Sequence, residues 1–595
     1  MSVRRFAGLI FLSLLPLTLG FNWDESKFMS IDEIKPGMEG IARTVFEGTK
    51  IEEFKVRILS VQRNAFPKSD LIRAVGIDDK IKRTGVLSGM SGSPVYVDGR
   101  LIGAIAYAYS FSKEPIMGIT PIESMLKIWD YPDGPSSPEE TGLLPFFSPE
   151  ELLRWVRERM ELASAEAPSP GELRPIKVPI AISGFSPQAA RALKALLSEG
   201  NFTVVEGGGG GRPDLNPPIR PGAVVGTEFI RGDLTAFGYG TVTYREGDRI
   251  LIFGHPAYGE GRVEMPLSGG YVHCVVPSLY LGFKLAGPTK PFGTMVQDRE
   301  FGCAGIIGPV PPYIPVKVKV TTADGRTIDY NYEVVRHRYL TPALITSAVW
   351  TTIDVAEKET GNYTVRVRAV IVPEKYPAIV KENVFSGSAS PGLAAASVLY
   401  PISTLMRNQF EEIGIERVEL EVKVEDERRS ASIIGARLDK RVYKPGETMR
   451  LTVTIRPYLE EPIQRTVEIR LPDDMPEGNA MAVIGSAAAV RAWEKTRAPQ
   501  RYTPRNVEQL LRLLQEEEPN DRLIVEIVLP KPGLTVSGEE MPNLPISMLY
   551  VMNPSIQAGE VGLTKGTVLL KKSMETGFVL SGSAVLRFVV SRKAR

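Results

Sequence analysis

Residues 84–95 of this chain read Thr-Gly-Val-Leu-Ser-Gly-Met-Ser-Gly-Ser-Pro-Val. Gly89 and Gly92 stand close to Ser91, and glycine adopts backbone conformations that other residues avoid. We therefore expect a sharp loop at Ser91 that turns its backbone amides inward. The apolar residues Val95 to Val97 follow at once and would fix the loop to a sheet.

The sequence on both sides of this loop predicts a mainly β protein. Phe54 to Val61 alternates between apolar and polar residues, as half-buried strands do. The stretch from Val95 to Ala106 is typical of a hairpin, with Asp98-Gly99 at its turn. Val316 to Val320 and Tyr363 to Val370 alternate in the same way. The 55 glycines and 47 prolines also suit short strands joined by many turns.

Composition shifts divide the chain into several units, since 595 residues are too many for one core. We expect β-barrel halves at residues 31–130 and 219–372, separated by a linker and a small α/β insert at 131–218. Within that insert, Ser186-Pro187 is typical of a helix start. Residues 373–429 are expected to form a helical connector, and residues 430–595 a C-terminal β-sandwich-like module.

The first twenty residues predict an export signal. Arg4 and Arg5 precede an apolar run from Phe6 to Leu19, and Thr18 and Gly20 are small enough for a cleavage site near Phe21. We therefore expect residues 1–20 to be a signal peptide and the rest to lie in the periplasm, in the cell envelope or outside the cell. A signal that stays uncleaved would instead hold the chain near the membrane.

Charge and cysteine content exclude several classes of function. Lys and Arg number 71 against 70 Asp and Glu, so no bulk charge favours nucleic acid as a partner. The only cysteines are Cys274 and Cys303, which an exported compartment would allow to pair. The usual paired-ligand spacings of metal sites are missing, and we expect neither a metal nor another cofactor. The oligomeric state is not indicated.

Ser91 is the candidate nucleophile. A serine hydroxyl attacks a carbonyl only when a base takes its proton and donors stabilise the oxyanion. In the inward-turned loop, the amides of Gly89 and Ser91 would be those donors. The base must come from three histidines. His337 lies in a charged stretch typical of solvated backbone, and His273 in a mostly apolar strand typical of packing. His255 ends an apolar strand between Gly254 and Pro256, where a rigid turn could present it.

These motifs resemble the stage IV sporulation protein B (SpoIVB) family of serine peptidases. The resemblance rests on residues 84–95, on Gly99 to Ala104 and Gly118 to Leu126, and, further along, on Gly254-His255 and Gly302 to Gly308. It implies a chymotrypsin-like double β-barrel whose nucleophile loop has the form Gly-x-Ser-Gly-x-Pro. Here the serine precedes the histidine by 164 residues, so the two barrels are expected in permuted order.

The resemblance leaves the acidic partner of the histidine open. Family logic places it shortly before the serine, where Asp78 and Asp79 stand, while chymotrypsin-like logic places it in the histidine's barrel, at Asp298. We favour Asp298, and a Ser-His dyad without an acid is the other reading.

Two functions from different classes follow. The first is an exported serine endopeptidase that acts on protein or peptide substrates through Ser91 and His255. The alternative is a catalytically inactive envelope protein that uses the same fold to bind or scaffold a partner. A small-molecule esterase is disfavoured because the Gly-x-Ser-x-Gly elbow is missing.

Overall fold

The computed structural model describes residues 23–131 except 67–68, residues 172–541 except 198–199, 209, 279, 281 and 357–362, residues 561–593, and the single positions 158, 547, 551 and 552. The expected signal peptide and most of the expected linker lie outside these residues. Half of the chain is strand and 17% is helix, so the mainly β class is confirmed.

The first unit is a closed six-stranded barrel. Its strands follow the order β4-β1-β2-β3-β6-β5, and the pairing of β4 with β5 closes the ring. Side chains alternate between core and solvent along β1 and β2, which is why these segments form strands and not helices. The elements are β1 (Glu39–Val45), β2 (Ile51–Phe66), β3 (Ser69–Gly76), α1 (Asp79–Thr84), β4 (Pro94–Val97), β5 (Arg100–Tyr109), β6 (Ile116–Pro121), α2 (Ile122–Leu126) and the short 3₁₀ helix η1 (Lys127–Asp130).

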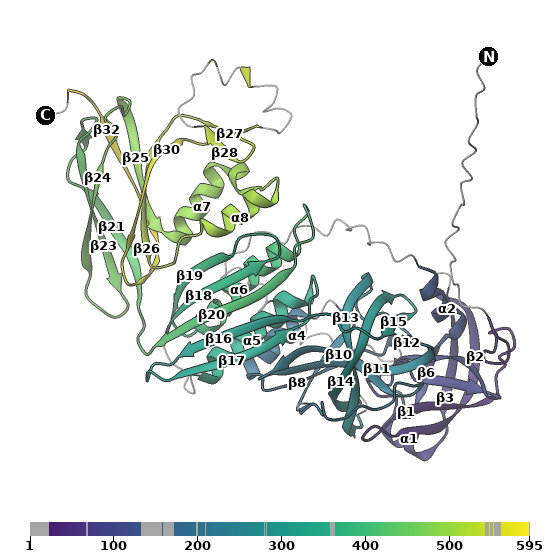
Figure 1. Ribbon diagram of the computed structural model, residues 1–595. Coiled ribbons are helices and arrows are strands. Elements are labelled where there is room, and N and C mark those ends of the chain that lie inside the picture. Colours follow the sequence, from purple (N-terminus) through teal and green to yellow (C-terminus); the bar gives the residue numbers. More distant parts are fainter. Residues whose placement is uncertain are drawn as a thin grey trace, which may run out of the picture.

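A second ring of six strands follows further along the chain. Its order is β10-β13-β14-β15-β12-β11, and β10 pairs with β11 to close it. The strands are β10 (Val224–Gly232), β11 (Thr235–Glu246), β12 (Arg249–Ile252), β13 (Gly261–Val276), β14 (Phe283–Arg299) and β15 (Gly302–Ile307). The two barrels lie side by side at one end of the molecule (Figure 1), which agrees with the predicted chymotrypsin-like double barrel.

The segment between the barrels contributes to both sheets. β7 (Leu173–Pro175) pairs with β5 of the first barrel, whereas β8 (Val178–Ser183) pairs with β11 of the second. β9 (Phe202–Glu206) runs parallel to β8, and α4 (Pro187–Leu196) connects them. The helix starts at the predicted Ser186-Pro187, where the Ser186 hydroxyl accepts a hydrogen bond from the amide of Ala189. The described part of the expected insert therefore extends both sheets: β7 extends the first, and β8 and β9 extend the second.

The same sheet continues past the second barrel on its other side. β17 pairs with β10, and the order β19-β18-β20-β16-β17 gives five further strands. Helices α5 and α6 pack against these strands and against each other (Figure 1). The elements are β16 (Ile314–Thr321), β17 (Thr327–Val334), α5 (Leu340–Ala356), β18 (Thr364–Pro373), β19 (Ile379–Ser386), α6 (Ser390–Met406) and β20 (Ile415–Glu425). The expected helical connector thus holds one long helix and two strands.

Two sheets enclose the core of the C-terminal unit, as in a β-sandwich. One has the order β24-β23-β21-β31 and the other β22-β32-β25-β26-β30, and side chains such as Leu451, Ile455 and Val525 fill the space between them. Its elements are β21 (Ser430–Leu438), β22 (Val442–Tyr443), β23 (Thr448–Pro457), β24 (Ile463–Arg470), β25 (Gly478–Ser486), α7 (Ala487–Arg497), η2 (Pro499–Tyr502), α8 (Val507–Gln515), β26 (Arg522–Leu529), β27 (Leu534–Val536), β28 (Glu539–Met541), β29 (Val561–Leu563), β30 (Thr567–Glu575), β31 (Val579–Ser581) and β32 (Ser583–Val590).

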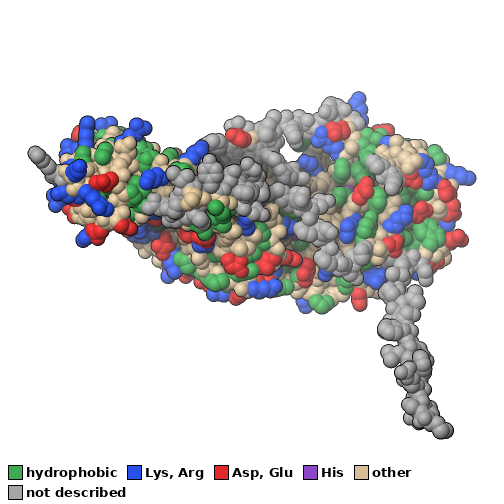
Figure 2. Space-filling model, turned by 90° about the horizontal axis from the view of Figure 1, so that it is seen from above, with side chains coloured by type: hydrophobic (Ala, Val, Ile, Leu, Met, Phe, Trp, Pro, Cys, Tyr) green, Lys and Arg blue, Asp and Glu red, His purple; other side chains and the backbone are tan. Residues whose placement is uncertain are grey.

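Acidic and basic side chains are interspersed over the face seen in Figure 2. This agrees with the near balance of 71 basic and 70 acidic residues in the sequence. None of the described helices is long and apolar enough to cross a bilayer.

Candidate active site

The loop around Ser91 is held by the second barrel. The amide of Thr241, on β11, donates to the carbonyl of Ser91 at 2.8 Å, and its hydroxyl donates to the carbonyl of Gly89 at 3.0 Å. The hydroxyl of Thr243 donates to the carbonyl of Gly92 at 2.8 Å. Three hydrogen bonds from one strand therefore fix the loop of the other barrel.

Gly92 is required where the barrels meet. Its φ is +91°, in a region that L side chains rarely adopt. A Cβ atom there would collide with the carbonyl oxygen of Thr241 and lie 2.6 Å from the amide nitrogen of Phe253. On its other side the loop meets β14, where the amide of Lys284 donates to the carbonyl of Ser88 at 3.1 Å. The loop lies between two strands of the second barrel.

Two amides of the loop have no acceptor. The amides of Ser88, Met90, Gly92 and Ser93 each donate to a backbone carbonyl. Within the described part of the chain, no hydrogen bond is formed by the amides of Gly89 and Ser91. Burying a backbone N–H without a partner is costly, so two such amides in one loop mark a place where a ligand oxygen can bind.

His255 stands on a strained turn at the end of β12. Phe253 has a φ of +70° and Gly254 a φ of +73°. A positive φ is a genuine outlier for a bulky residue such as Phe253, and such strain persists only where the surroundings impose it. Here the hydroxyl of Thr120, from the first barrel, donates to the carbonyl of Gly254 at 2.6 Å. The turn that presents His255 is thus also fastened across the barrel interface.

Two groups lie against the Nδ1 side of the His255 ring. Nδ1 is 2.8 Å from the carbonyl oxygen of Pro256, which favours a ring proton on Nδ1 because a carbonyl can only accept. Nε2 then keeps its lone pair. The side-chain nitrogen Nδ2 of Asn201 lies 3.0 Å from the same Nδ1 and donates to the Pro256 carbonyl oxygen at 3.4 Å. Burial lowers the pKa of His255 to about 4, although the backbone of Pro256 and Ile176 beside the ring raises it. The imidazole is therefore neutral at pH 7.

Ser91 and His255 are both anchored on the same stretch of β5. The amide of Gly92 donates to the carbonyl of Ile105 at 2.8 Å, and a Cβ placed at Gly254 would lie 3.1 Å from that of Ala104. Both side chains are fully buried. Among the described residues, the Ser91 Oγ and the His255 Nε2 have no hydrogen-bond partner, so they are not bonded to each other. Catalytic hydrogen bonds are often long without substrate and shorten when it binds.

Asp298 holds the loop that follows His255, not its ring. Its two carboxylate oxygens accept from the amides of Ala257, Tyr258 and Gly259 at 2.7–2.9 Å, and Cys303 Sγ lies 3.3 Å from one of them. No hydrogen bond joins Asp298 to His255 in the described chain.

The alternative acids, Asp78 and Asp79, form no hydrogen bond with His255 in the part of the chain that the structure describes. Asp78 accepts from the amide of Lys55, and Asp79 is exposed at the start of α1. The side chain that contacts Nδ1 is Asn201, which sequence reasoning missed because it follows a helix with no motif around it.

A buried lysine beside the loop was also missed. Lys284 is fully buried, and its Nζ donates to the hydroxyl of Thr44 at 2.7 Å. Ser93 donates to the same Thr44 oxygen at 3.0 Å. Burial lowers the pKa of Lys284 to about 7. The sequence around Lys284 does not predict a buried cation, because the burial arises only when the two barrels pack together.

The other two histidines differ from expectation, and the pairing of the cysteines, which the sequence left open, is not formed. His337 is buried, and its Nε2 lies 3.2 Å from Glu260, so the prediction of a solvated position is wrong. His273 is exposed at the end of β13 and not packed in a core. Cys274 is exposed and Cys303 buried, and the two do not form a disulfide.

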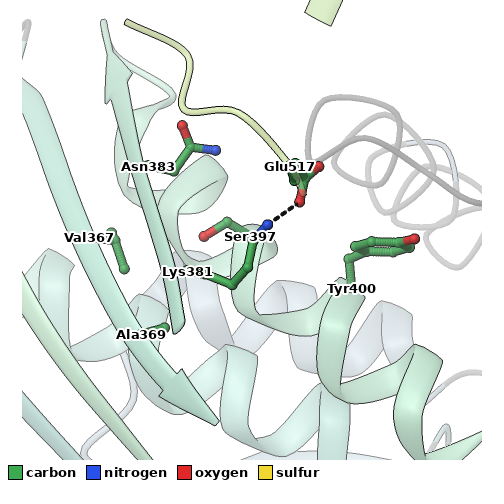
Figure 3. A pocket seen from close by; sticks show the side chains of 7 residues that line it. All are labelled: Val367, Ala369, Lys381, Asn383, Ser397, Tyr400 and Glu517. Atoms are coloured by element: carbon green, nitrogen blue, oxygen red, sulfur yellow. Dashed lines mark ion pairs between the residues drawn. The ribbon is translucent and has the colours of Figure 1, made fainter. Parts of the chain in front are cut away.

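Two cavities lie away from this site. One of about 10 Å³ is enclosed by β18, β19, α6 and Glu517, and in it Lys381 pairs with Glu517 at 2.9 Å (Figure 3). A wider groove of about 520 Å³ is lined by paired charges such as Arg366 and Asp521. Neither is lined by Ser91 or His255.

The comparison with known families concerns the barrel that carries Ser91. Residues 22–126 match the model of the family described as SpoIVB peptidase S55. The predicted resemblance to the SpoIVB peptidases is therefore confirmed, and with it the general class of peptidase. The match ends before β7 and does not reach His255. No curated protein and no solved structure matches the chain.

Proposed function

We propose that this protein is an exported serine endopeptidase in which Ser91 is the nucleophile and His255 the general base. The observation that carries the proposal is the presence of two buried reactive atoms, the Ser91 Oγ and the His255 Nε2, that have no hydrogen-bond partner among the described residues and whose loops both lie against β5. The SpoIVB peptidase match over residues 22–126 supports the reaction class.

The mechanism follows from the positions of the protons. Neutral His255, with its proton on Nδ1, accepts the Ser91 hydroxyl proton on Nε2 as Oγ attacks the substrate carbonyl. The negative charge that develops on the carbonyl oxygen is met by the two amides without acceptors, those of Gly89 and Ser91. His255 then gives the proton to the leaving amine, and water releases the acyl group from Ser91. The Pro256 carbonyl and Asn201 hold the Nδ1 side of the ring, in the place where a carboxylate would stand in a triad.

A fluorophosphonate probe tests the assignment. It should label the wild type on a single residue, Ser91, as located by peptide mapping, and Ser91→Ala should remove all labelling. Ser93→Ala is the matched control, since Ser93 lies in the same loop but its hydroxyl is bonded to Thr44. Equal labelling of wild type and Ser91→Ala would refute the nucleophile. A wild type that never reacts would favour the inactive scaffold.

Export is part of the same proposal and rests on Arg4, Arg5 and the apolar run after them. Protein recovered from outside the cytoplasm should begin near Phe21. A mature protein that retains Met1 would instead indicate a signal that stays in place.

A further inference from the structure

A short segment of the chain lies along the edge of β5 that Ser91 faces. We call Leu173 to Ile176 the strap. Along this edge β4 pairs first, with Pro94 opposite Ala104. The Ser91 loop comes next, through hydrogen bonds of Gly92 and Ser93 with Ile105. The strap begins where that loop ends, so it occupies the next places on the same edge.

The backbone of the strap is bound as an added strand. Pro175, Arg174 and Leu173 pair antiparallel with Tyr107, Ala108 and Tyr109. The amide of Ile176 donates to the carbonyl of Ala106 at 2.8 Å. The register of β5 with β6 skips Ala106, as in a β-bulge, and such bulges re-aim backbone groups next to active sites. Strand addition of this kind is a standard way for proteins to bind extended peptides.

One side chain of the strap is buried. Ile176 is 5% exposed and belongs to the apolar cluster of the first barrel that also contains Met90 and Ile105. Lys177, the next residue, is exposed. The groove therefore selects a branched apolar side chain at the position of Ile176, while the backbone hydrogen bonds place no demand on the identity of the other residues.

The strap also passes the other reactive residue. The backbone of Ile176 lies beside the His255 ring. Two residues later, the amide of Val178 donates to the carbonyl of Asn201 at 2.8 Å, and the Asn201 side chain touches the same ring. The chain thus leaves the first barrel and enters the second where Ser91 and His255 lie, which accounts for their complete burial.

We propose that the strap occupies the groove in which this peptidase binds its substrates, and that those substrates are extended peptides with a branched apolar residue at the position of Ile176. The inference rests on the proposed function. In the described chain, the amides of Gly89 and Ser91 do not donate to the Ile176 carbonyl. The strap is therefore held as a competitor that an incoming peptide must displace.

Peptide binding in the full-length Ser91→Ala background tests the proposal without any catalysis. The probe is a fluorescein-labelled peptide with the sequence of residues 172–176, Glu-Leu-Arg-Pro-Ile, followed by fluorescence anisotropy. Ile176→Asp places a charge in the apolar cluster and should release the strap, so the peptide should bind at least tenfold more tightly than in Ser91→Ala alone. Lys194→Asp puts the same residue on an exposed position of α4 and should change nothing.

The two proposals can fail separately. If Ile176→Asp prevents folding, Ile176→Gly removes the anchoring side chain without adding a charge and should give the same gain. Equal affinity in the released and control variants would overturn the strap proposal, even if the fluorophosphonate probe labels Ser91. With Ser91 intact, release should also speed labelling at least tenfold. Tight peptide binding without any labelling would retain the groove and refute the catalytic assignment.

Discussion

Gly92→Ala should destabilise the contact between the two barrels more than an ordinary loop substitution would. The added Cβ meets the carbonyl of Thr241 and the amide of Phe253, which are backbone atoms and cannot turn aside. The positive φ costs about 1–2 kcal/mol for an L residue. Relieving the collision breaks the bonds that Thr241 and Thr243 make to the loop, each worth about 1 kcal/mol. The expected loss is about 3–5 kcal/mol.

Gly99→Ala provides the control for backbone strain alone. Gly99 has a φ of +77°, but its Cβ would meet no atom within 4 Å. It should therefore cost only about 1–2 kcal/mol. For a unit of the size of the barrel pair, each kcal/mol lowers Tm by about 2–4 °C. We expect Gly92→Ala to lower the first unfolding transition in scanning calorimetry by about 10 °C and Gly99→Ala by about 4 °C. Equal shifts would refute the idea that the hydrogen bonds of Thr241 and Thr243 to the Ser91 loop hold the two barrels together.

Three further outcomes follow from the site. The pKa of His255, lowered to about 4, implies that the rate of fluorophosphonate labelling stays constant down to about pH 5 and falls by half near pH 4; a midpoint near 6.5 would contradict the buried neutral ring. Lys284→Met removes a cation whose pKa burial lowers to about 7 in the folded protein, from an unfolded value of 10.5. Between pH 7 and 10.5 the unfolded wild type binds more protons than the folded wild type, so the free energy of unfolding of the wild type rises with pH over this range. The variant should therefore exceed the wild type in Tm by several degrees at pH 7 and by much less at pH 10, and a constant difference would contradict this. Asp298→Asn leaves one oxygen for three amides and should cost about 2–3 kcal/mol and slow labelling through the loosened loop, whereas an unchanged Tm would show that the carboxylate is dispensable.

The parts of the fold that local sequence encodes were predictable. The turn at Asp98-Gly99 has the expected positive φ values of +49° and +77°. Gly89 and Gly92 are both at +91°, as the loop around Ser91 required. A positive φ selects glycine at that position alone, so a single sequence carries the signal.

The parts that depend on contacts between distant segments were not predictable. β17 joins β10 through only three residue pairs, yet this joint makes one continuous sheet of thirteen strands. Edge pairing of this kind leaves no periodic pattern, because the strands alternate in the same way whether or not their edges are paired. One sheet therefore spans strands from the predicted segments 131–218, 219–372 and 373–429.

The candidate site shows the same division. Ser91 and His255 could be chosen because the glycines around them permit backbone conformations closed to other residues and Pro256 restricts the residue before it. Asn201 and Lys284 lie in segments whose own sequences are ordinary, and they reach the site only when the barrels pack. The strap could not be predicted for the same reason, since it pairs with β5 from over sixty residues further along the chain.

The hydrogen bonds that fix the Ser91 loop can form only late in the synthesis of the chain. Ser91 leaves the ribosome long before Thr241 and Thr243, whose three hydrogen bonds fix the loop. At about 5–20 residues per second, the 152 residues from Ser91 to Thr243 take roughly 8–30 s to be made. Throughout that interval the nascent chain carries its serine in an unfastened loop, without the histidine that follows later still. A translating chain therefore has neither the fixed loop nor His255 until most of its first half has been made.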